Sequence, residues 1–353
     1  MGEFARSSAI AQGAQARWPQ AAVLFIVSRR APYAGSAPFP TALLDSSPTF
    51  HSAEVIDIIE TWRPDMVIFD NAGRTAQLRA ARRAGARVVY ISARRRQRRK
   101  AFRLSWMRLI DEHWIAYPQF LAGALRPLER LKLAVLHRPQ VRYLDVILAG
   151  GAARSGRAAG AGYVLVIPGG GTGHPGARDA VAQFLAAARA LAASGIETCF
   201  VGRPEPPLAD AAAADAAAAD AAAANAAAAN AAADGSRLHM QGLLPQGELA
   251  GLMRGARLIV ANGGSTLLQG LACGAPCVAV PVAGDQDERI RRCVSAGAAV
   301  AAPLAAAAIV RAAIDLLHDE AALNALAGRA AALNLADGVA VAVRAMAALL
   351  DPP

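Results

Sequence analysis

The sequence has few cysteines, and they are not arranged for a disulfide framework or a metal site. They stand at positions 199, 273, 277 and 293 of the 353 residues, with no Cys-x-x-Cys pair and no histidine cluster beside them. Isolated cysteines of this kind are typical of small buried side chains in a reducing cytosol. We therefore expect no metal and a cytoplasmic location.

Long apolar segments are also lacking. No apolar run reaches the roughly 18 to 20 residues that a membrane span requires. The start of the sequence has no apolar core of the kind found in a signal peptide, which argues against export. Gly2-Glu3-Phe4 resembles residues added by cloning, so we expect it to lie outside the fold.

Acidic residues are missing from one long basic segment. Thirteen Lys or Arg residues lie between Asp70 and Asp111 without any acid among them, and this exceeds the net charge of +10 of the whole chain. A local field of this size predicts a polyanionic partner, which could be anionic lipid, a phosphorylated glycolipid or nucleic acid.

What the sequence does contain is a repeated alternation of short apolar runs and helical patterns. Apolar runs at 21–27, 66–70, 86–92, 163–168, 196–202, 257–264 and 276–281 are separated by turn residues and amphipathic segments. This rhythm is typical of parallel βαβ units. The prediction is an α/β protein of two Rossmann-like domains facing a central cleft, covering 1–150 and 163–353, with a Gly/Ala/Arg linker at 151–162.

An alanine-rich segment at 209–234 repeats nearly every five residues as AAAAD or AAAAN. A period of five does not keep one face on an α-helix, so this segment cannot supply an amphipathic core stripe. The favoured interpretation is a surface insertion without chemistry, and the alternative is a flexible lid.

A glycine-rich loop, PGGGTGHPG, follows the predicted strand at 163–168 and opens a helix. Glycines let backbone N–H groups approach an anion, and a helix N-terminus adds favourable partial charge. The loop lacks the GK[ST] ending of a Walker A motif and the ribose-binding acid of a G-x-G-x-x-G unit. It predicts a diphosphate site, although a tight turn that merely needs glycine remains the alternative. The candidate residues are Gly169, Gly170, Gly171, Thr172, Gly173 and His174.

Two further polar corners follow the next predicted strands. Asn262, Gly263, Gly264, Ser265 and Thr266 come after one strand, and Asp285 with Gln286 comes after the following strand. Ligands in open α/β sheets bind outside the carboxyl ends of the strands, so the three loops should converge. Amides and hydroxyls suit phosphate, and the Asp-Gln pair suits sugar hydroxyls, which together predict a sugar nucleotide.

At these residues the second half, about 160 to 335, resembles the donor-binding domain of GT-B glycosyltransferases. It most resembles the branch that contains the lipid-II-forming N-acetylglucosaminyltransferase and the UDP-glucuronosyl and glucosyl transferases. The resemblance implies that the glycine loop meets the diphosphate, that Leu243 and Leu244 flank the base, and that Gly263 to Thr266 contact phosphate. It also implies that Gln269 stands where an acid normally holds the ribose, and that Asp285 and Gln286 meet the donor sugar.

The resemblance implies an inverting mechanism without a metal, because the paired glutamates of the retaining GT-B pattern are absent. Such a transfer needs one general base and fixed dipoles for the leaving diphosphate. Asp70, at the end of the predicted strand MVIFD, is the first candidate base, followed by His51 and Asp45. Asp70 could instead cap the next helix, and His51 could be an exposed residue at a helix start.

The basic segment 93–110 carries a second prediction. Phe102, Trp106, Leu109 and Ile110 share one helical face, and a basic amphipathic helix with tryptophan is typical of a membrane-surface element. It could equally hold an anionic glycolipid acceptor or be a solvated basic helix. Nucleic acid ranks third, because aromatic stacking motifs are missing. The candidate residues are Arg94, Arg95, Arg96, Arg98, Arg99, Lys100 and Trp106.

The sequence as a whole predicts a glycosyltransferase that is peripheral on the inner face of the cell membrane. It would move a sugar from a nucleotide-diphospho-sugar, which the resemblance implies is UDP-linked, to a cell-envelope glycolipid or polysaccharide. No cofactor is expected, because the nucleotide sugar is a substrate. A nucleotide-sugar hydrolase or epimerase on the same fold is one alternative. A non-catalytic module that binds a membrane or a partner is the other.

Overall fold

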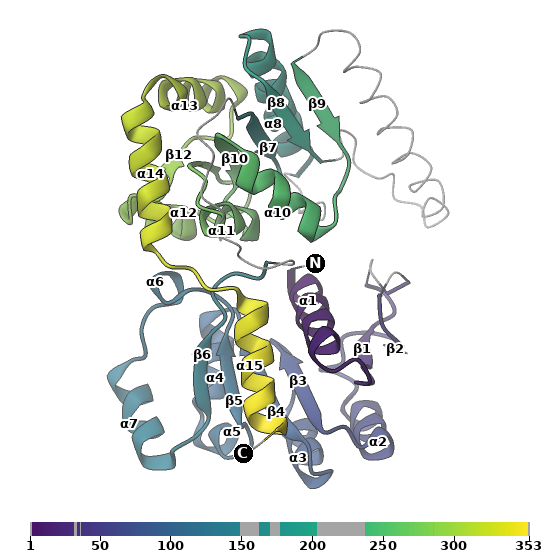
Figure 1. Cartoon of the computed structure of the whole chain (residues 1–353). Coiled ribbons are helices and arrows are strands. Elements are labelled where there is room, and N and C mark those ends of the chain that lie inside the picture. The colour runs from purple at the N-terminus through teal and green to yellow at the C-terminus, as the bar shows by residue number, and fades with distance from the viewer. Residues whose placement is uncertain are drawn as a thin grey trace. The chain divides into compact units, whose positions relative to one another are not determined.

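The computed structural model describes residues 2–31, 34–35, 37–148, 162–169, 177–202, 237–284 and 286–351. The chain forms two α/β units, one made of Met1–Ile147 with Ala336–Pro353 and the other of Leu148–Leu335 (Figure 1). Nearly all of the predicted linker and the whole alanine-rich insertion lie outside the described residues. No helix of the described part of the chain is long and apolar enough to cross a membrane.

The second unit is built on a six-stranded sheet whose paired strands are all parallel. The strands are β7 (Val164–Ile167), β8 (Thr198–Val201), β9 (Leu238–Gln241), β10 (Leu258–Asn262), β11 (Cys277–Val280) and β12 (Val300–Ala301). Their spatial order is β12-β11-β10-β7-β8-β9. In chain order this is the doubly wound arrangement 3-2-1-4-5-6, in which β7 is the first strand and the direction of winding reverses beside it.

Helices cover this sheet, which is why its short apolar strands are buried. They are α8 (Ala177–Ala193), α10 (Gln246–Gly255), α11 (Ser265–Ala272), α12 (Asp287–Ser295), α13 (Ala306–His318) and α14 (Glu320–Ala332). Phe184 of α8 and Ile309 of α13 are fully buried in one core with Val166 and Val260 of the central strands. The central strands are therefore fixed, and their carboxyl ends form a defined edge.

The first unit contains two parallel sheets. A two-stranded sheet pairs β1 (Phe25–Ser28) with β2 (Thr41–Leu44). A four-stranded sheet has the order β3 (Met66–Asp70), β4 (Arg87–Ser92), β5 (Glu112–Ile115) and β6 (Gln140–Tyr143). The helices of this unit are α1 (Gly2–Arg17), α2 (Ser52–Trp62), α3 (Thr75–Arg83), α4 (Arg95–Ala101), α5 (Leu104–Met107), α6 (Gln119–Ala122), α7 (Pro127–Leu136) and α15 (Gly338–Leu350).

The C-terminal helix α15 belongs to the first unit, so the predicted domain 163–353 is too long at that end. Ala342 and Met346 of α15 lie in one core with Ile10 of α1 and Trp114 of β5, and Figure 1 shows α15 beside the strands of this unit. The helix starts where Gly338 N–H donates to the Val146 carbonyl oxygen at 2.8 Å. Burial of this apolar face determines which unit the helix joins.

Several elements match the predicted ranges, including the strand at 66–70 and the helix at 177–193. Two expectations are wrong. The predicted loop 28–50 contains strand β2, and Gly2-Glu3-Phe4 forms the first residues of α1. The Phe4 ring packs edge-on against Phe25 of β1 with ring centroids 5.7 Å apart, so these residues are part of the fold.

Candidate functional site

Three loops of the second unit leave the same edge of its sheet. β10 pairs with β7 on one side and with β11 on the other, all in parallel register. The loops after these strands therefore start side by side, as predicted from the order of elements. Gly169, Asn262 and Gln286 are the described residues through which these loops contact one another.

Gly169 lies so close to Asn262 that a side chain there would force the Asn262 amide to move. Its φ of +85° lies in the left-handed region that favours glycine, and a Cβ added there would lie 2.2 Å from Asn262 Nδ2. Asn262 is buried, and its Oδ1 accepts a hydrogen bond from Gly264 N–H at 3.1 Å. The Asn262 side chain of the second loop thus lies directly against the backbone of Gly169 in the first loop.

Gln286 ties the second loop to the third. Its side chain is buried, and Oε1 accepts from the backbone N–H groups of Gly263 at 3.1 Å and Val282 at 2.9 Å. A Cβ on Gly263 would lie 2.6 Å from Ile290 Cδ1, so this position also requires glycine. The carbonyl oxygen of Gln286 positions the backbone of the corner, and its contact with the donor sugar stays a prediction.

Helix α11 opens this corner, and no side chain among the described residues caps its first turn. Gly264 is its N-cap and has no side chain to cap the first turn, and Ser265 is exposed. The N-terminus of a helix with free N–H groups is a ready anion-binding site. The two hydroxyls of Ser265 and Thr266 add donors that suit phosphate oxygens.

Arg289 of α12 is a residue that the sequence did not point to. Its guanidinium donates to the Gly263 carbonyl oxygen, which places a positive charge beside the turn that precedes α11. The only available signal was its spacing of three residues after Gln286, which puts the two on adjacent positions of one helix face. The charge strengthens the preference of this corner for an anion.

The other predicted donor residues lie outside the contacts that join Gly169, Asn262 and Gln286. Gln269 is half-buried in the second turn of α11. Leu243 is exposed in the loop after β9, and β9 is separated from β10 by β7 and β8 in the sheet. Six predicted residues lie outside the described ranges: Gly170, Gly171, Thr172, Gly173, His174 and Asp285.

In the first unit, Asp70 is engaged in a buried ion pair. Arg6 donates to both carboxylate oxygens, at 2.6 and 3.0 Å, and Ser7 Oγ donates to Oδ2 at 3.0 Å. Burial raises the pKa of Asp70, while the Arg6 guanidinium and these hydrogen bonds act in the opposite direction. With both oxygens occupied, this geometry favours a structural role over the predicted role as a base, and it does not match the helix cap that was the alternative.

His51 has the arrangement of an oriented base. It precedes α2, where Nδ1 lies 2.6 Å from Glu54 Oε1 and Nε2 lies 2.9 Å from Ser46 Oγ. A carboxylate that accepts from Nδ1–H leaves Nε2 as the acceptor nitrogen, which is the form that removes a proton. Glu54 was not predicted, although its spacing of three residues from His51 was visible. Asp45 is exposed and lies 3.7 Å from Arg29 Nε.

The basic segment 93–110 is not one amphipathic helix, and Arg98, Lys100 and Trp106 have partners within the first unit. Arg98 is buried against Glu129 at 2.7 Å and also donates to the carbonyl oxygens of 122, 123 and 124. Lys100 donates to the Gly73 carbonyl oxygen and lies 4.2 Å from the Trp106 ring centre. Trp106 is 2% exposed, because the predicted apolar face is core. The exposed members are Arg94, Arg95, Arg96 and Arg99.

The exposed apolar surface beside this segment belongs to α7. Leu128, Leu131 and Val135 are 61%, 60% and 69% exposed, and their spacing places them on one helix face. The Arg98–Glu129 pair joins α7 to α4, and Lys132 Nζ donates to the Phe102 carbonyl oxygen at 3.0 Å. We call Leu128, Leu131 and Val135 the α7 apolar face.

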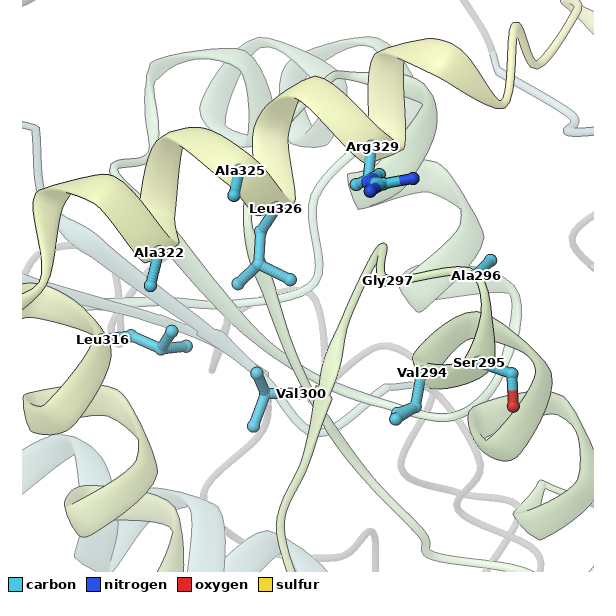
Figure 2. Close-up of a pocket in the computed structure, with 10 residues that line it drawn as sticks. All are labelled: Val294, Ser295, Ala296, Gly297, Val300, Leu316, Ala322, Ala325, Leu326 and Arg329. Carbon is cyan, nitrogen blue, oxygen red and sulfur yellow. The ribbon is translucent and has the colours of Figure 1, made fainter.

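A cavity of about 470 Å³ lies in the second unit but away from the predicted site. Figure 2 shows the C-terminal end of α12, strand β12 and helix α14 around it, with Val300, Leu326 and Arg329 among the lining residues. Because α12 starts at the loop after β11, its C-terminal end leads to the opposite edge of the sheet. None of the predicted donor residues lines this cavity.

The described residues contain no group of three or more His, Cys, Asp or Glu side chains that could hold a metal ion. The cysteines are unpaired thiols, and burial raises the pKa of Cys199 and Cys293 to about 11. Such thiols are protonated near neutral pH and are poor nucleophiles.

Comparisons with known proteins were made by sequence and by structure. No family model matches the sequence, and the search of curated proteins found no match. Among solved structures, MurG of Acinetobacter baumannii superposes with a TM-score of 0.58 at 16% identity, covering 98% of this chain and 95% of that chain. CalG4, the calicheamicin glycosyltransferase, gives 0.59 at 15% identity, with 98% and 94% covered.

A third similar structure is a UDP-N-acetylglucosamine 2-epimerase, with a TM-score of 0.54 at 13% identity and coverage of 98% and 93%. At such low identities the likeness establishes the fold. The chain has the GT-B fold of two Rossmann-like units, which confirms the predicted class and the predicted resemblance.

Proposed function

We propose that the chain is an inverting, metal-independent glycosyltransferase. It moves a sugar from a nucleotide-diphospho-sugar, UDP-linked, to a hydroxyl of a cell-envelope glycolipid. The observation that carries the proposal is the corner formed by Gly169, Asn262 to Thr266 and Gln286, where glycine contacts expose the uncapped start of α11. An anion with several oxygens fits these donors, and a leaving diphosphate is such an anion.

His51 is the proposed general base of this reaction. In the transfer, the acceptor oxygen forms a bond to the anomeric carbon and its proton passes to His51 Nε2. The bond from the anomeric carbon to the diphosphate oxygen breaks, and the nucleoside diphosphate leaves with the electron pair. Glu54 holds Nδ1–H and stabilises the imidazolium that results. The proton transfer and the departure of the nucleoside diphosphate use only side chains and backbone groups of this chain.

The acceptor and the membrane are proposed from the surface of the first unit. The buried Arg98–Glu129 pair joins α7, which carries the α7 apolar face, to α4, which carries the exposed Arg95 and Arg99. Apolar side chains bordered by cations fit the interface of an anionic bilayer. We therefore propose a protein peripheral to the inner face of the cell membrane, where a lipid-linked acceptor is presented.

A second candidate function is supported by the similarity to a UDP-N-acetylglucosamine 2-epimerase. The same corner would hold the nucleotide, while the chemistry would occur within the donor sugar and no acceptor would be needed. The exposed apolar and basic surface of the first unit has no use in that reaction, so the transferase is preferred.

One experiment separates these functions. The full-length chain is incubated with a panel of nucleotide sugars, with and without a bacterial lipid extract, and nucleoside diphosphate release and sugar configuration are measured. Release that depends on the extract supports the transferase. Release without the extract indicates a hydrolase, and an altered sugar without release indicates an epimerase.

Donor binding is measured separately by thermal unfolding with nucleoside diphosphates. A nucleoside diphosphate present at one hundred times its Kd raises the free energy of unfolding by about 2.7 kcal/mol. If no nucleoside diphosphate raises the melting temperature, the proposed donor site is wrong. Vesicle binding without any turnover would instead favour a non-catalytic module.

A further inference from the structure

The cavity at the C-terminal end of α12 has no part in the proposed donor site. Its volume of about 470 Å³ is within the range of about 300–1,000 Å³ that is usual for small-molecule sites. It lies at the edge of the sheet opposite the donor corner, because α12 starts at that corner and ends at the cavity. The cavity is therefore a candidate for a separate binding site in the second unit.

One wall of the cavity is a single face of α14. Four residues of this helix line it at positions i, i+3, i+4 and i+7, which share one side of a helix: they are Ala322, Ala325, Leu326 and Arg329. Figure 2 shows this row along α14, with Arg329 at one end of it. The methyl groups of the two alanines leave space that longer apolar side chains would fill in an ordinary core.

The opposite wall is the end of α12 and the turn that follows it. Gly297 has a φ of +68°, in the left-handed region. The backbone N–H of Gly297 donates to the Val294 carbonyl oxygen at 2.8 Å, and that of Ala298 donates to the Cys293 carbonyl oxygen at 3.0 Å. These bonds fix the turn, and they leave neither N–H group available to a ligand.

The surface between the two walls is apolar and partly open to solvent. Leu316 and Leu326 belong to the core of the second unit and are each 8% exposed, whereas Val294 is 39% exposed. In Figure 2 the side chains of Leu326 and Val300 point toward one another from α14 and β12. An apolar chain lying in this space would cover Val294 and extend the core of the unit.

Arg329 supplies the charge of this cavity. Its side chain is exposed, and among the described residues no ion pair or side-chain hydrogen bond engages the guanidinium. A Cβ built on Gly297 would lie 3.5 Å from Arg329 Cγ and 3.9 Å from Nε, so the side chain reaches the opposite wall. Arg329 therefore places a cation with unused N–H donors at one end of an apolar cavity.

We propose that the cavity binds a small amphiphilic carboxylate. The carboxylate pairs with Arg329, and an unbranched apolar chain lies along α14 toward Leu316, which Figure 2 shows at the other end. A single guanidinium matches a single carboxylate through two parallel hydrogen bonds, whereas a phosphate dianion would keep an unpaired charge.

The length and the lining of the cavity restrict the chain of this ligand. The seven residues from Ala322 to Arg329 span about 10 Å along the helix axis, which suits a chain of medium length. Apart from Arg329 and Ser295 the lining residues are apolar, so a polar group within the chain would lose its hydration without gaining a partner. The inference concerns the second unit alone and does not depend on the proposed function.

Calorimetry with sodium octanoate tests the site on the full-length chain. Acetate supplies the same headgroup without the chain, and octan-1-ol supplies the chain without the charge. We expect octanoate to bind at one site, at least about tenfold more tightly than either of the other two compounds. In methyl NMR spectra, octanoate should shift the resonances of Val294 and Val300 and leave those of Val201, in β8, unchanged.

Two variants separate the charge from the shape of the cavity. Arg329→Met removes the guanidinium and keeps an unbranched side chain, and Ala325→Leu fills the apolar wall. Each should weaken octanoate binding by about tenfold or more. Arg311→Met is the matched control, because Arg311 is an exposed arginine of α13 that does not line the cavity. Melting temperatures confirm that each variant is folded.

The proposal is overturned if octanoate does not bind, because the cavity is then only a crevice between short side chains. It is also overturned if octan-1-ol binds as tightly as octanoate, or if Arg329→Met binds octanoate as tightly as Arg311→Met does. UDP binding is recorded for each form. Absence of UDP binding in every form, with octanoate still bound, would count against the proposed donor site and leave the cavity site standing.

Discussion

The side chains proposed for proton transfer differ in how far their hydrogen-bonding capacity is already used. Both oxygens of Asp70 are held by Arg6, whereas Nε2 of His51 has the Ser46 hydroxyl as its one partner among the described residues. A hydroxyl can rotate away and be replaced by an acceptor hydroxyl, but a buried guanidinium cannot leave its carboxylate without a large penalty. Replacing His51 should therefore mainly lower activity, and replacing Asp70 should mainly lower stability.

We predict that His51→Asn lowers kcat by about 100-fold or more and leaves the melting temperature nearly unchanged. Asp70→Asn should destabilise the first unit by about 3 kcal/mol, because Arg6 loses its buried partner. Steady-state kinetics and thermal unfolding of both variants measure the contrast. Asp45→Asn is the control, since its exposed pair with Arg29 contributes little. A stable but inactive Asp70→Asn protein would restore Asp70 as the base.

Gly169 provides a test of the donor corner. An alanine there should strain the left-handed backbone by about 1–2 kcal/mol and push its methyl group against Asn262. Nucleoside diphosphate binding should weaken by about tenfold or more, as measured by calorimetry. Gly328→Ala in α14 is the matched control, because Gly328 has no left-handed φ and a Cβ there meets no atom within 4 Å. Equal affinities for the two variants would contradict the site.

His113 should make the stability of the first unit sensitive to acid. Burial lowers the pKa of His113 to about 3, whereas an unfolded histidine titrates near 6.5. Below about pH 6.5 the unfolded chain takes up a proton that the folded chain refuses, so stability falls as the pH decreases toward 3. Between pH 7 and 5, urea unfolding should show a loss of about 2 kcal/mol from this residue. In the His113→Gln variant, the free energy of unfolding should change less with pH over this range. This holds whatever the stability of the variant at pH 7.

Sequence reasoning reached the polar corner residues because position at a strand end is enough to bring them together. It could not reach Glu54 or Arg289, since their roles depend on which side chains they meet in space. It also could not find β5, whose Glu112 looks incompatible with a buried strand. That carboxylate is 1% exposed and accepts from Arg142 at 2.7 Å and from Trp114 Nε1 at 2.8 Å. Arg142 lies 30 residues from Glu112, and a pairing over that distance leaves no local signal.

At the scale of elements, the basic segment shows how an apolar stripe can mislead. Phe102, Trp106 and Ile110 have the spacing of a membrane-facing helix, yet all three are buried in the core. Periodicity identifies an apolar face but does not say whether protein or lipid covers it. The exposed face lies instead on α7, where Glu129 points inward to Arg98 and the leucines point outward.

We predict that the double variant Leu131→Glu with Val135→Glu binds vesicles containing one-third phosphatidylglycerol at least about tenfold more weakly, because each apolar residue contributes roughly 1.5–3 kcal/mol when buried. Sedimentation of the vesicles measures bound protein. Trp62→Glu is the control, since this exposed apolar residue lies on α2 away from the basic segment. An equal loss in the control would indicate a general charge effect and remove the role assigned to α7.

At the scale of the whole molecule, the alternation of strands and helices sufficed to predict the two-unit α/β fold. The last helix was assigned to the wrong unit, because the sequence of an alanine-rich amphipathic helix does not indicate which apolar surface it packs against. Ala342 and Met346 could face any apolar surface, and only the assembled core with Ile10 and Trp114 selects one. Boundaries set by long-range burial are in this respect less predictable than the elements themselves.

The return of α15 to the first unit has a consequence for synthesis on the ribosome. The second unit, Leu148–Leu335, is an insertion within the first, whose last helix emerges only after the whole insertion has been made. Until then, the surface of Ile10, Ala14 and Trp114 lacks its cover and is exposed to the nascent chain and to chaperones. The inserted unit can fold first, although the chain for the other unit is synthesised earlier. A premature stop near residue 335 should thus damage the unit that contains the N-terminus, which loses α15, more than the inserted unit, which is already complete.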